Sequence, residues 1–366
     1  MKPNLVFTLL SLFAVNVSFA QEVKVYKTWN PAADTKSMVA GQAWPKEAAD
    51  YYDRLPARAE ALVRKPVWNL SKNSTGLNLR FRSDAEEIVV KYQVKGNLQM
   101  PHMSATGVSG VDLYAKGSDG KWLWARGAYS FKDTIVYRFT NLHASNTKEP
   151  EYTLYLPLYN SVKWMEISVP EKNTFVVLPV PQKPIVVYGT SIAQGACASR
   201  PGMVWTSILS RKLERPFINL AFSGNGPMEK AIVDLLPEID ASMYVLDCLP
   251  NMTGEFFSDE EINKRIEYAV AELQKKKPGI PVLLTEHDGY TDEGLNPERK
   301  RLYERVNVVM NKTFRAMKSR GVKNIFLLTK AEINQDVNTM VDGTHPNDIG
   351  MMRYAEAYEK IIRKMK

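Results

Sequence analysis

The feature that most constrains this chain is a change in hydrophobic periodicity about halfway along it. Before residue 178, apolar and polar residues alternate in short runs, at 77–82, 88–94, 152–156 and 162–167. After residue 184, apolar residues form continuous runs, at 185–188, 217–220, 243–246, 282–284 and 325–328. Alternation is typical of strands with one buried face, and continuous runs are typical of strands buried on both faces. The chain is therefore predicted to contain two different domains.

The first half is predicted to be an antiparallel β-sandwich, because its short strands are separated by Asn, Gly, Ser and Asp turns. It ends at residues 178–184, where three prolines in seven residues exclude a sheet interior. In the second half, helical stretches alternate with the buried strands, at 204–213, 228–236, 260–276, 297–320 and 347–364. This alternation predicts an α/β domain with a five-stranded parallel sheet. Ligands of such sheets bind beyond the carboxyl ends of the strands.

The first twenty residues are typical of a cleavable signal peptide. Lys2 is followed by the apolar run 5–15, which is too short to span a bilayer, and then by the small-x-small pattern at 18–20. We therefore expect an exported, periplasmic or secreted protein with no stable membrane insertion. The domains expected are a signal peptide at 1–20, a β-sandwich at 21–177, a linker at 178–184 and an α/β domain at 185–366. A glycosylation sequon at Asn251 favours a bacterial source, because a glycan there would block the site described below.

The charge of the chain does not point to a polyanionic partner. Lys and Arg outnumber Asp and Glu by 48 to 40, and no block of five basic residues occurs. A solvated basic surface explains this excess, so no nucleic-acid partner is expected. The four histidines lack metal-ligand spacing, and no phosphate-binding glycine motif follows a strand. We therefore expect no metal and no cofactor. The oligomeric state cannot be inferred from the sequence.

Polar residues follow the predicted parallel strands at the edge where ligands bind. Ser191 follows the first strand, Gly224 the second and Asn251 the third. His345 comes after the fifth strand, three residues beyond Asp342. A serine needs an adjacent base to act as a nucleophile, and the imidazolium then formed needs a carboxylate. We therefore predict Ser191, His345 and Asp342 as catalytic groups for acyl transfer.

The tetrahedral intermediate of acyl transfer carries an oxyanion that needs hydrogen-bond donors. The backbone N–H groups of Ser191 and Gly224 and the side-chain amide of Asn251 are the candidates. They follow the first, second and third strands of the predicted sheet.

These segments resemble the SGNH, or GDSL-type, hydrolase superfamily from about residue 185 to the C-terminus. Its Ser, Gly, Asn and Asp-x-x-His blocks match Ser191, Gly224, Asn251 and 342–345, although the first block here reads Gly-Thr-Ser. The segments 110–114 (Gly-Val-Asp-Leu-Tyr) and 195–203 resemble a bacterial subgroup with an N-terminal GxDLY-type sandwich. The resemblance implies a three-layer α/β/α hydrolase domain and an exported esterase that often removes acetyl groups from carbohydrates.

Several other residues have two interpretations each. Arg200 either contacts an anionic substrate group or anchors its loop. Glu286 and His287 end the fourth strand and form either a structural pair or a substrate contact. Asp112 is expected to fix a turn in the sandwich. The sandwich is expected to pack near the active-site mouth, through loops at 102–110 or the hairpin of Trp122 and Trp124.

Only two cysteines occur, so a disulfide framework is not expected. Cys197 and Cys248 are either two buried thiols or one bridge. Since the first and third strands are neighbours in SGNH-type sheets, the resemblance makes the bridge possible.

The leading hypothesis is a serine esterase that hydrolyses a small ester, such as an acetyl ester of a small molecule or an oligosaccharide. One alternative is a lipase-like esterase for longer acyl chains. An ordinary α/β-hydrolase fits less well, because Ser191 follows the first strand of the parallel sheet. The alternative from another class is a carbohydrate-binding protein with an inert hydrolase half.

Overall fold

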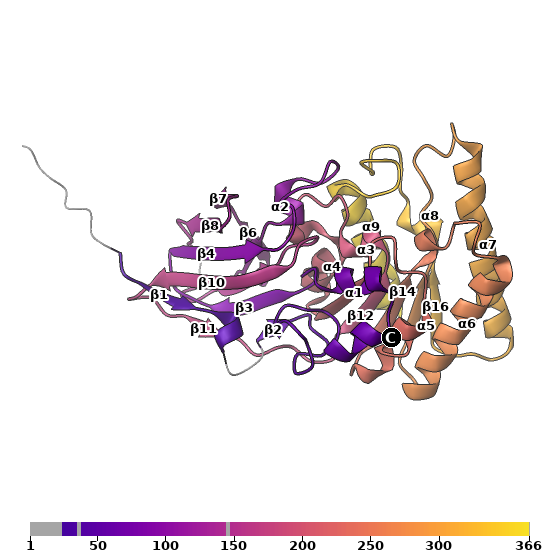
Figure 1. Ribbon diagram of the computed structural model, residues 1–366, viewed down its shortest axis with the longest axis horizontal. Coiled ribbons are helices and arrows are strands. Elements are labelled where there is room, and N and C mark those ends of the chain that lie inside the picture. The colour runs from indigo at the N-terminus through magenta and orange to yellow at the C-terminus, as the bar shows by residue number, and fades with distance from the viewer. Residues whose placement is uncertain (1–23, 35–37, 144–146, 366) are drawn as a thin grey trace, which may run out of the picture.

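The computed structural model describes residues 24–34, 38–143 and 147–365. Figure 1 shows a β-sandwich at one end of an elongated molecule and an α/β domain at the other. The predicted signal peptide lies outside the described residues. Within them, no helix combines the length and apolar character that a bilayer crossing requires.

The first half is the predicted antiparallel sandwich. One sheet has the strand order β1-β10-β4-β8-β7, and the other has the order β11-β3-β9-β5-β6, with β2 paired to β3. Alternate residues such as Leu79, Phe81, Val90 and Tyr92 fill one core between the sheets. The strand bounds are β1 Tyr26–Trp29, β2 Val39–Ala40, β3 Asn78–Arg82, β4 Glu87–Val94, β5 Asp112–Lys116, β6 Trp122–Ala125, β7 Gly127–Ser130, β8 Ile135–Thr140, β9 Glu151–Tyr155, β10 Val162–Pro170 and β11 Val176–Val177.

The second half is the predicted α/β domain, with five parallel strands in the order β13-β12-β14-β15-β16. Each strand is buried on both faces: in β12, Val186 and Tyr188 face one core, and Ile185 and Val187 face the other. The strands are β12 Ile185–Gly189, β13 Phe217–Ala221, β14 Met243–Asp247, β15 Val282–Thr285 and β16 Ile325–Leu328. The α-helices are α3 Ser191–Gln194, α4 Trp205–Leu213, α5 Lys230–Val233, α6 Asp259–Lys276, α7 Pro297–Ser319, α8 Lys330–Ile333 and α9 Asp348–Lys364.

One predicted helix is much shorter than expected. The stretch 228–236 contains only α5, and a short 3-10 helix follows at Leu236–Glu238. Met228 has a φ of 50°, which is outside the range of a right-handed helix. Pro237 has no N–H to donate to the carbonyl of Val233, so the α-helix does not continue through it, and Pro237 instead lies in the 3-10 helix.

Part of the first half covers the sheet of the second. The segment before β3 contains a 3-10 helix at Ala57–Ala61 and helix α1 at Lys65–Ser71. Trp44, Leu55 and Val67 of this segment are buried in the same core as β12 and α6. The sequence analysis assigned the segment to the sandwich and did not anticipate this packing. Without this segment, part of one face of the parallel sheet would be exposed to water.

The buried Arg54 joins this segment to the parallel sheet. Its side chain is 1% exposed, and Nη1 donates to the backbone carbonyls of Asn219 and Ala221, 2.9 Å away in each case. Nη2 and Nε donate to the carbonyls of Leu70 and Asn73, both at 2.7 Å. Burial lowers the pKa of Arg54 to about 9, so the guanidinium remains charged at neutral pH.

A second junction involves Asp112 of the GxDLY segment. Its buried carboxylate accepts hydrogen bonds from Arg200, from the backbone N–H of Gly202 at 2.9 Å and from Trp124 Nε1 at 2.6 Å. The Arg200 guanidinium also lies 4.5 Å from the centre of the Trp124 ring. Asp112 therefore contacts the α/β domain and does more than fix a turn within the sandwich. Trp122 donates to the carbonyl of Arg211, so both tryptophans of the hairpin belong to this junction.

We expect Arg54→Ala to lower the free energy of unfolding by about 3 kcal/mol or more, since it leaves two buried and two partly buried carbonyls without a charged donor. Denaturant titration of the full chain measures this effect. Arg58→Ala is the matched control, because Arg58 is 43% exposed and pairs with surface glutamates. The control should change stability by less than about 1 kcal/mol. Equal losses in the two variants would contradict the role assigned to Arg54.

Candidate active site

The backbone after β12 places Ser191 at the start of a short helix. Thr190 is extended, and Ser191 begins α3 with 7% of its surface exposed. A Cβ atom at Gly189 would lie 2.7 Å from the Cβ of Ala193 and 3.0 Å from the carbonyl oxygen of Asp247. Only glycine fits this turn, which brings the serine to the edge of the sheet.

The loop before α9 carries the two other candidate catalytic residues. It folds back on itself, because Val341 N–H donates to the carbonyl of His345 at 2.9 Å. The Asp342 carboxylate lies 2.7 Å from His345 Nδ1 and accepts the His345 backbone N–H at 2.8 Å. His345 Nε2 is 2.9 Å from Ser191 Oγ. The structure thus joins Ser191, His345 and Asp342 in one chain of hydrogen bonds.

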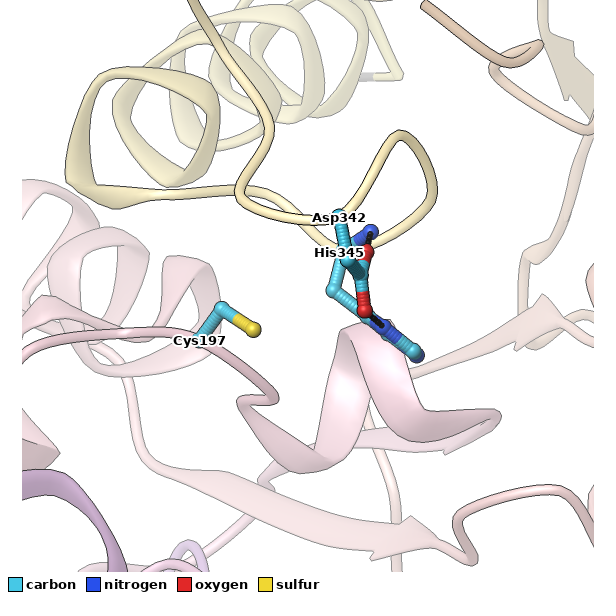
Figure 2. Close-up of side chains that lie close together, drawn as sticks. All are labelled: Cys197, Asp342 and His345. Atoms are coloured by element: carbon cyan, nitrogen blue, oxygen red, sulfur yellow. Dashed lines mark hydrogen bonds and ion pairs between the residues drawn. The ribbon is translucent and has the colours of Figure 1, made fainter. Parts of the chain in front are cut away.

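Figure 2 shows Asp342 and His345 side by side on this loop, with Cys197 facing them from another segment. Partial burial raises the pKa of Asp342, but the hydrogen bonds from the His345 ring, the His345 N–H and the Thr344 N–H outweigh it, so the net pKa is lowered. The Asp342 carboxylate is therefore ionised at neutral pH and accepts a hydrogen bond from the N–H at Nδ1 of His345. This leaves Nε2 free to accept the proton of Ser191.

Arg299 of α7 supports the turn that carries these residues. Its Nη2 donates to Thr344 Oγ1 at 2.6 Å and to the carbonyl of Gly343 at 3.4 Å. Asp292 in turn holds Nη1 at 3.1 Å. Arg299 is a positioning residue that sequence reasoning missed, because nothing in a solvated helix pattern distinguishes this arginine from its neighbours.

The three predicted oxyanion donors are available for a ligand. Gly224 has a φ of 67°, and a Cβ atom there would meet nothing within 4 Å, so its backbone borders open space. Asn251 accepts the N–H of Gly226 through Oδ1 at 2.9 Å, which leaves its side-chain NH₂ free to donate. The N–H of Ser191 is at the first position of α3, where no intrahelical acceptor exists.

A cavity of about 450 Å³ opens beside Gly224 and Asn251. Its walls carry charged groups that are already paired: Arg64 donates to Glu229, and Arg265 donates to Glu261 at 2.7 Å. The remaining walls are apolar or aromatic and consist of Pro227, Phe256 and Phe257. Phe256 is 82% exposed. The space next to the oxyanion donors is therefore polar, with one exposed aromatic ring.

The two cysteines are free and buried, so the structure contains no bridge between them. Cys197 Sγ contacts the carbonyl of His102 at 3.5 Å, and Cys248 Sγ contacts the carbonyl of Tyr188 at 3.4 Å. The neighbouring strands do converge as expected, but Cys248 points into the core on one face of the sheet. Cys197 packs in a small separate cluster near the sandwich.

Cys197, Asp342 and His345 place potential ligand atoms within 4.8 Å of one another. Burial, together with the negative charge of Asp342, raises the pKa of Cys197 to about 12, so the thiol stays protonated. A protonated thiol is a poor metal ligand. Both nitrogens of His345 are already engaged, by Asp342 and Ser191. This arrangement suits proton transfer better than metal binding.

The other candidate residues are held in structural contacts. Arg200 is committed to the Asp112 junction and acts as a loop anchor. The Glu286 carboxylate accepts the N–H of Lys330 at 2.6 Å and the side-chain amide of Asn311. His287 is 1% exposed, and its Nδ1 accepts the N–H of Gly289 at 2.9 Å. None of the three is hydrogen-bonded to the Ser191 and His345 pair.

Two buried acids beneath the site were missed by the sequence analysis. Asp247 ends β14 directly beside Gly189 and is 0% exposed, and Asp288 is 2% exposed. Burial, and to a smaller extent the charge of Asp288, raise the pKa of Asp247 to about 7, although a hydrogen bond with Tyr358 opposes them. No sequence signal separates Asp247 from an ordinary acid at a strand end.

We expect the contribution of Asp247 to the free energy of unfolding to fall as the pH rises from about 4 to about 7. Folded Asp247 keeps a proton in this window, whereas the unfolded residue, with an ordinary pKa of 3.8, has lost it. Asp247→Asn removes this cost, so it should stabilise the protein at pH 7 by at least about 1 kcal/mol and change little at pH 4. Thermal and denaturant unfolding at both pH values measure the effect, with the exposed Asp133→Asn as control. A stability gain that is the same at both pH values would contradict this assignment.

Sequence comparisons agree with the two halves of the structure. Residues 182–363 match the GDSL-like Lipase/Acylhydrolase family, and residues 27–175 match the GxDLY family, described as the N-terminus of SGNH-hydrolase-type esterases. No curated protein sequence matches the chain.

Three solved structures illustrate the similarity. A protein of Bacteroides ovatus assigned to the GDSL-like lipases has 32% identity and a TM-score of 0.83, covering 93% of this chain and 98% of its own. A salicylyl-acyltransferase from a tetracycline biosynthetic pathway has 17% identity and a TM-score of 0.73, with 93% and 97% covered. An acetyl xylan esterase of Butyrivibrio proteoclasticus has 9% identity and a TM-score of 0.53, with 93% and 98% covered. The last two show a shared fold alone. The extent and identity of the first match, together with the two family matches, establish that this chain belongs to the GDSL-like lipase/acylhydrolase family.

Proposed function

We propose that this protein is an exported serine esterase that removes a small acyl group, such as acetyl, from a carbohydrate hydroxyl. The observation that carries the proposal is the continuous chain of hydrogen bonds from Ser191 through His345 to Asp342. Each group in it has the partner that its role in ester hydrolysis requires.

In the first step, Ser191 Oγ attacks the ester carbonyl carbon while its proton moves to His345 Nε2. The Asp342 carboxylate stabilises the imidazolium through Nδ1. The carbonyl oxygen becomes an oxyanion, and the N–H groups of Ser191 and Gly224 and the Asn251 amide donate to it. His345 then gives the proton to the departing alcohol, which leaves an acyl-enzyme. Water attacks this ester by the same proton transfers and releases the acid.

The polarity of the cavity supports a short acyl group. A long acyl chain would lie against the Arg64–Glu229 and Arg265–Glu261 pairs and remove them from water without replacing their hydration. A solved structure with the same fold is an acetyl xylan esterase, which supports an acetyl ester of a carbohydrate as the substrate proposed here.

Export is supported by the sequence at 1–20, with its apolar run and small-x-small cleavage pattern. A periplasmic or secreted location is consistent with action on oligosaccharides outside the cytoplasm.

We expect Ser191→Ala and His345→Ala each to lower kcat for p-nitrophenyl acetate by roughly 10³-fold or more. The double variant should be no worse than either single variant, because the two groups act as one unit. Asp342→Asn should lose less, since hydrogen bonding alone partly orients the ring. The lowered pKa of Asp342 keeps its carboxylate ionised at neutral pH.

The matched controls are Ser319→Ala and His143→Ala, which alter exposed side chains on other parts of the molecule. Acetate release from acetylated oligosaccharides should be compared with a nitrophenyl ester series of rising chain length. Strong preference for octanoate or longer chains would replace the deacetylase with a lipase-like esterase. Activity retained in Ser191→Ala would overturn the serine mechanism.

A further inference from the structure

A rigid turn of the sandwich half places a histidine beside the catalytic one. Met100 and Met103 exchange two backbone hydrogen bonds, of 3.0 and 3.1 Å, which leave Pro101 and His102 at the tip. Proline fixes its own φ, so the tip has little freedom. His102 is exposed, and its ring centre lies 6.0 Å from that of His345, with the ring planes inclined by 28°.

The turn is anchored to the loop that follows the nucleophile. Met103 and Val108 pack with Ala196 and Cys197 in a small apolar cluster. The Cys197 thiol contacts the carbonyl of His102 itself, at 3.5 Å. The backbone of His102 is therefore held by buried contacts, although its ring is at the surface.

The same loop is tied to the sandwich and to α9 through Ser199. Thr106 Oγ1 donates to the carbonyl of Ser199 at 2.8 Å. The N–H of Ser199 donates to Asp348, the first residue of α9, at 2.9 Å. A Cβ atom at Gly107 would be 2.5 Å from the carbonyl oxygen of Ala198, so the two backbones lie in close contact here. These links hold the turn against the loop that leads from Ser191.

The chemistry of ester cleavage decides which part of the substrate meets His102. His345 must protonate the leaving alcohol, so the alcohol oxygen lies next to Nε2, while the oxyanion lies toward Gly224 and Asn251. We propose that His102 is a substrate-binding residue that hydrogen-bonds a hydroxyl next to the esterified one on the sugar. This inference rests on the proposed function and assigns its alcohol-side specificity to the sandwich half.

A hydroxyl is the partner that fits His102. One imidazole nitrogen donates and the other accepts, as a hydroxyl also does, so either can complete the bond. Among the described residues, no other side chain hydrogen-bonds to the His102 ring. The Cys197 thiol contacts the backbone carbonyl of this residue instead. The ring thus lies beside that of His345 with its polar atoms available.

The test compares two substrates in five proteins. One substrate is a methyl glycoside with a single acetyl group and free neighbouring hydroxyls, and the other has these hydroxyls methylated. We expect wild type to prefer the free form by roughly 3- to 10-fold in kcat/KM, the worth of one hydrogen bond. His102→Ala and His102→Phe should lose this preference, and His102→Gln, which keeps a donor and an acceptor, should retain most of it. His143→Ala, an exposed histidine on the sandwich, should behave as wild type.

Three results would overturn the inference, and each has a distinct signature. Retention of the preference in His102→Phe would show that ring packing is sufficient. A shift in the acid limb of p-nitrophenyl acetate hydrolysis in His102→Gln would show that His102 acts through His345. Equal use of both glycosides by wild type would exclude the hydrogen bond. If wild type cleaves p-nitrophenyl acetate but neither glycoside, the carbohydrate function itself fails.

Discussion

The packing of the first half of the chain onto the parallel sheet of the second is the constraint on which the rest of the structure depends. Arg54 gives its charged donors to carbonyls at the end of β13, and the residues around it fill the core on one face of the sheet. A guanidinium is buried only where hydrogen-bond acceptors replace its contacts with water. The four carbonyls around Arg54 therefore hold the two halves in one arrangement. The segment from Trp44 to Leu70 lies in the first half of the sequence, but it packs against the α/β domain.

This junction has a direct consequence for the site. The hydrogen-bonded chain from Ser191 to Asp342 belongs entirely to the α/β domain, as its position at strand ends requires. The surroundings of that chain are shared: Asp112 holds the loop after the nucleophile through Arg200, and the turn at Met100–Met103 covers its Cys197 side. In the proposed esterase, the second half supplies the catalytic groups, and the first half shapes the approach of the substrate to them.

Where the structure differs from the expectations drawn from the sequence, there is a physical reason. The helix expected at 228–236 was too long, because apolar periodicity does not register the left-handed torsion at Met228. The two cysteines follow neighbouring strands, as expected, but their side chains point to different cores. For Arg200, Glu286 and His287, the structure agrees with the structural one of the two interpretations. Arg200 pairs with Asp112, Glu286 accepts the N–H of Lys330, and His287 accepts the N–H of Gly289. Arg299 and Asp247 gave no signal, since their roles come from neighbours distant in the chain.

The sequence by itself determined the two domain types, the strand order along the chain and the serine, histidine and aspartate of the site. Periodicity depends on which faces are buried, and strand ends of a parallel sheet meet at one edge, so both can be inferred from local patterns. Only the tertiary structure decided which half covers which face, where the cysteines point and that His102 lies beside His345. These features depend on contacts between residues tens to hundreds of positions apart, and no local pattern records such contacts.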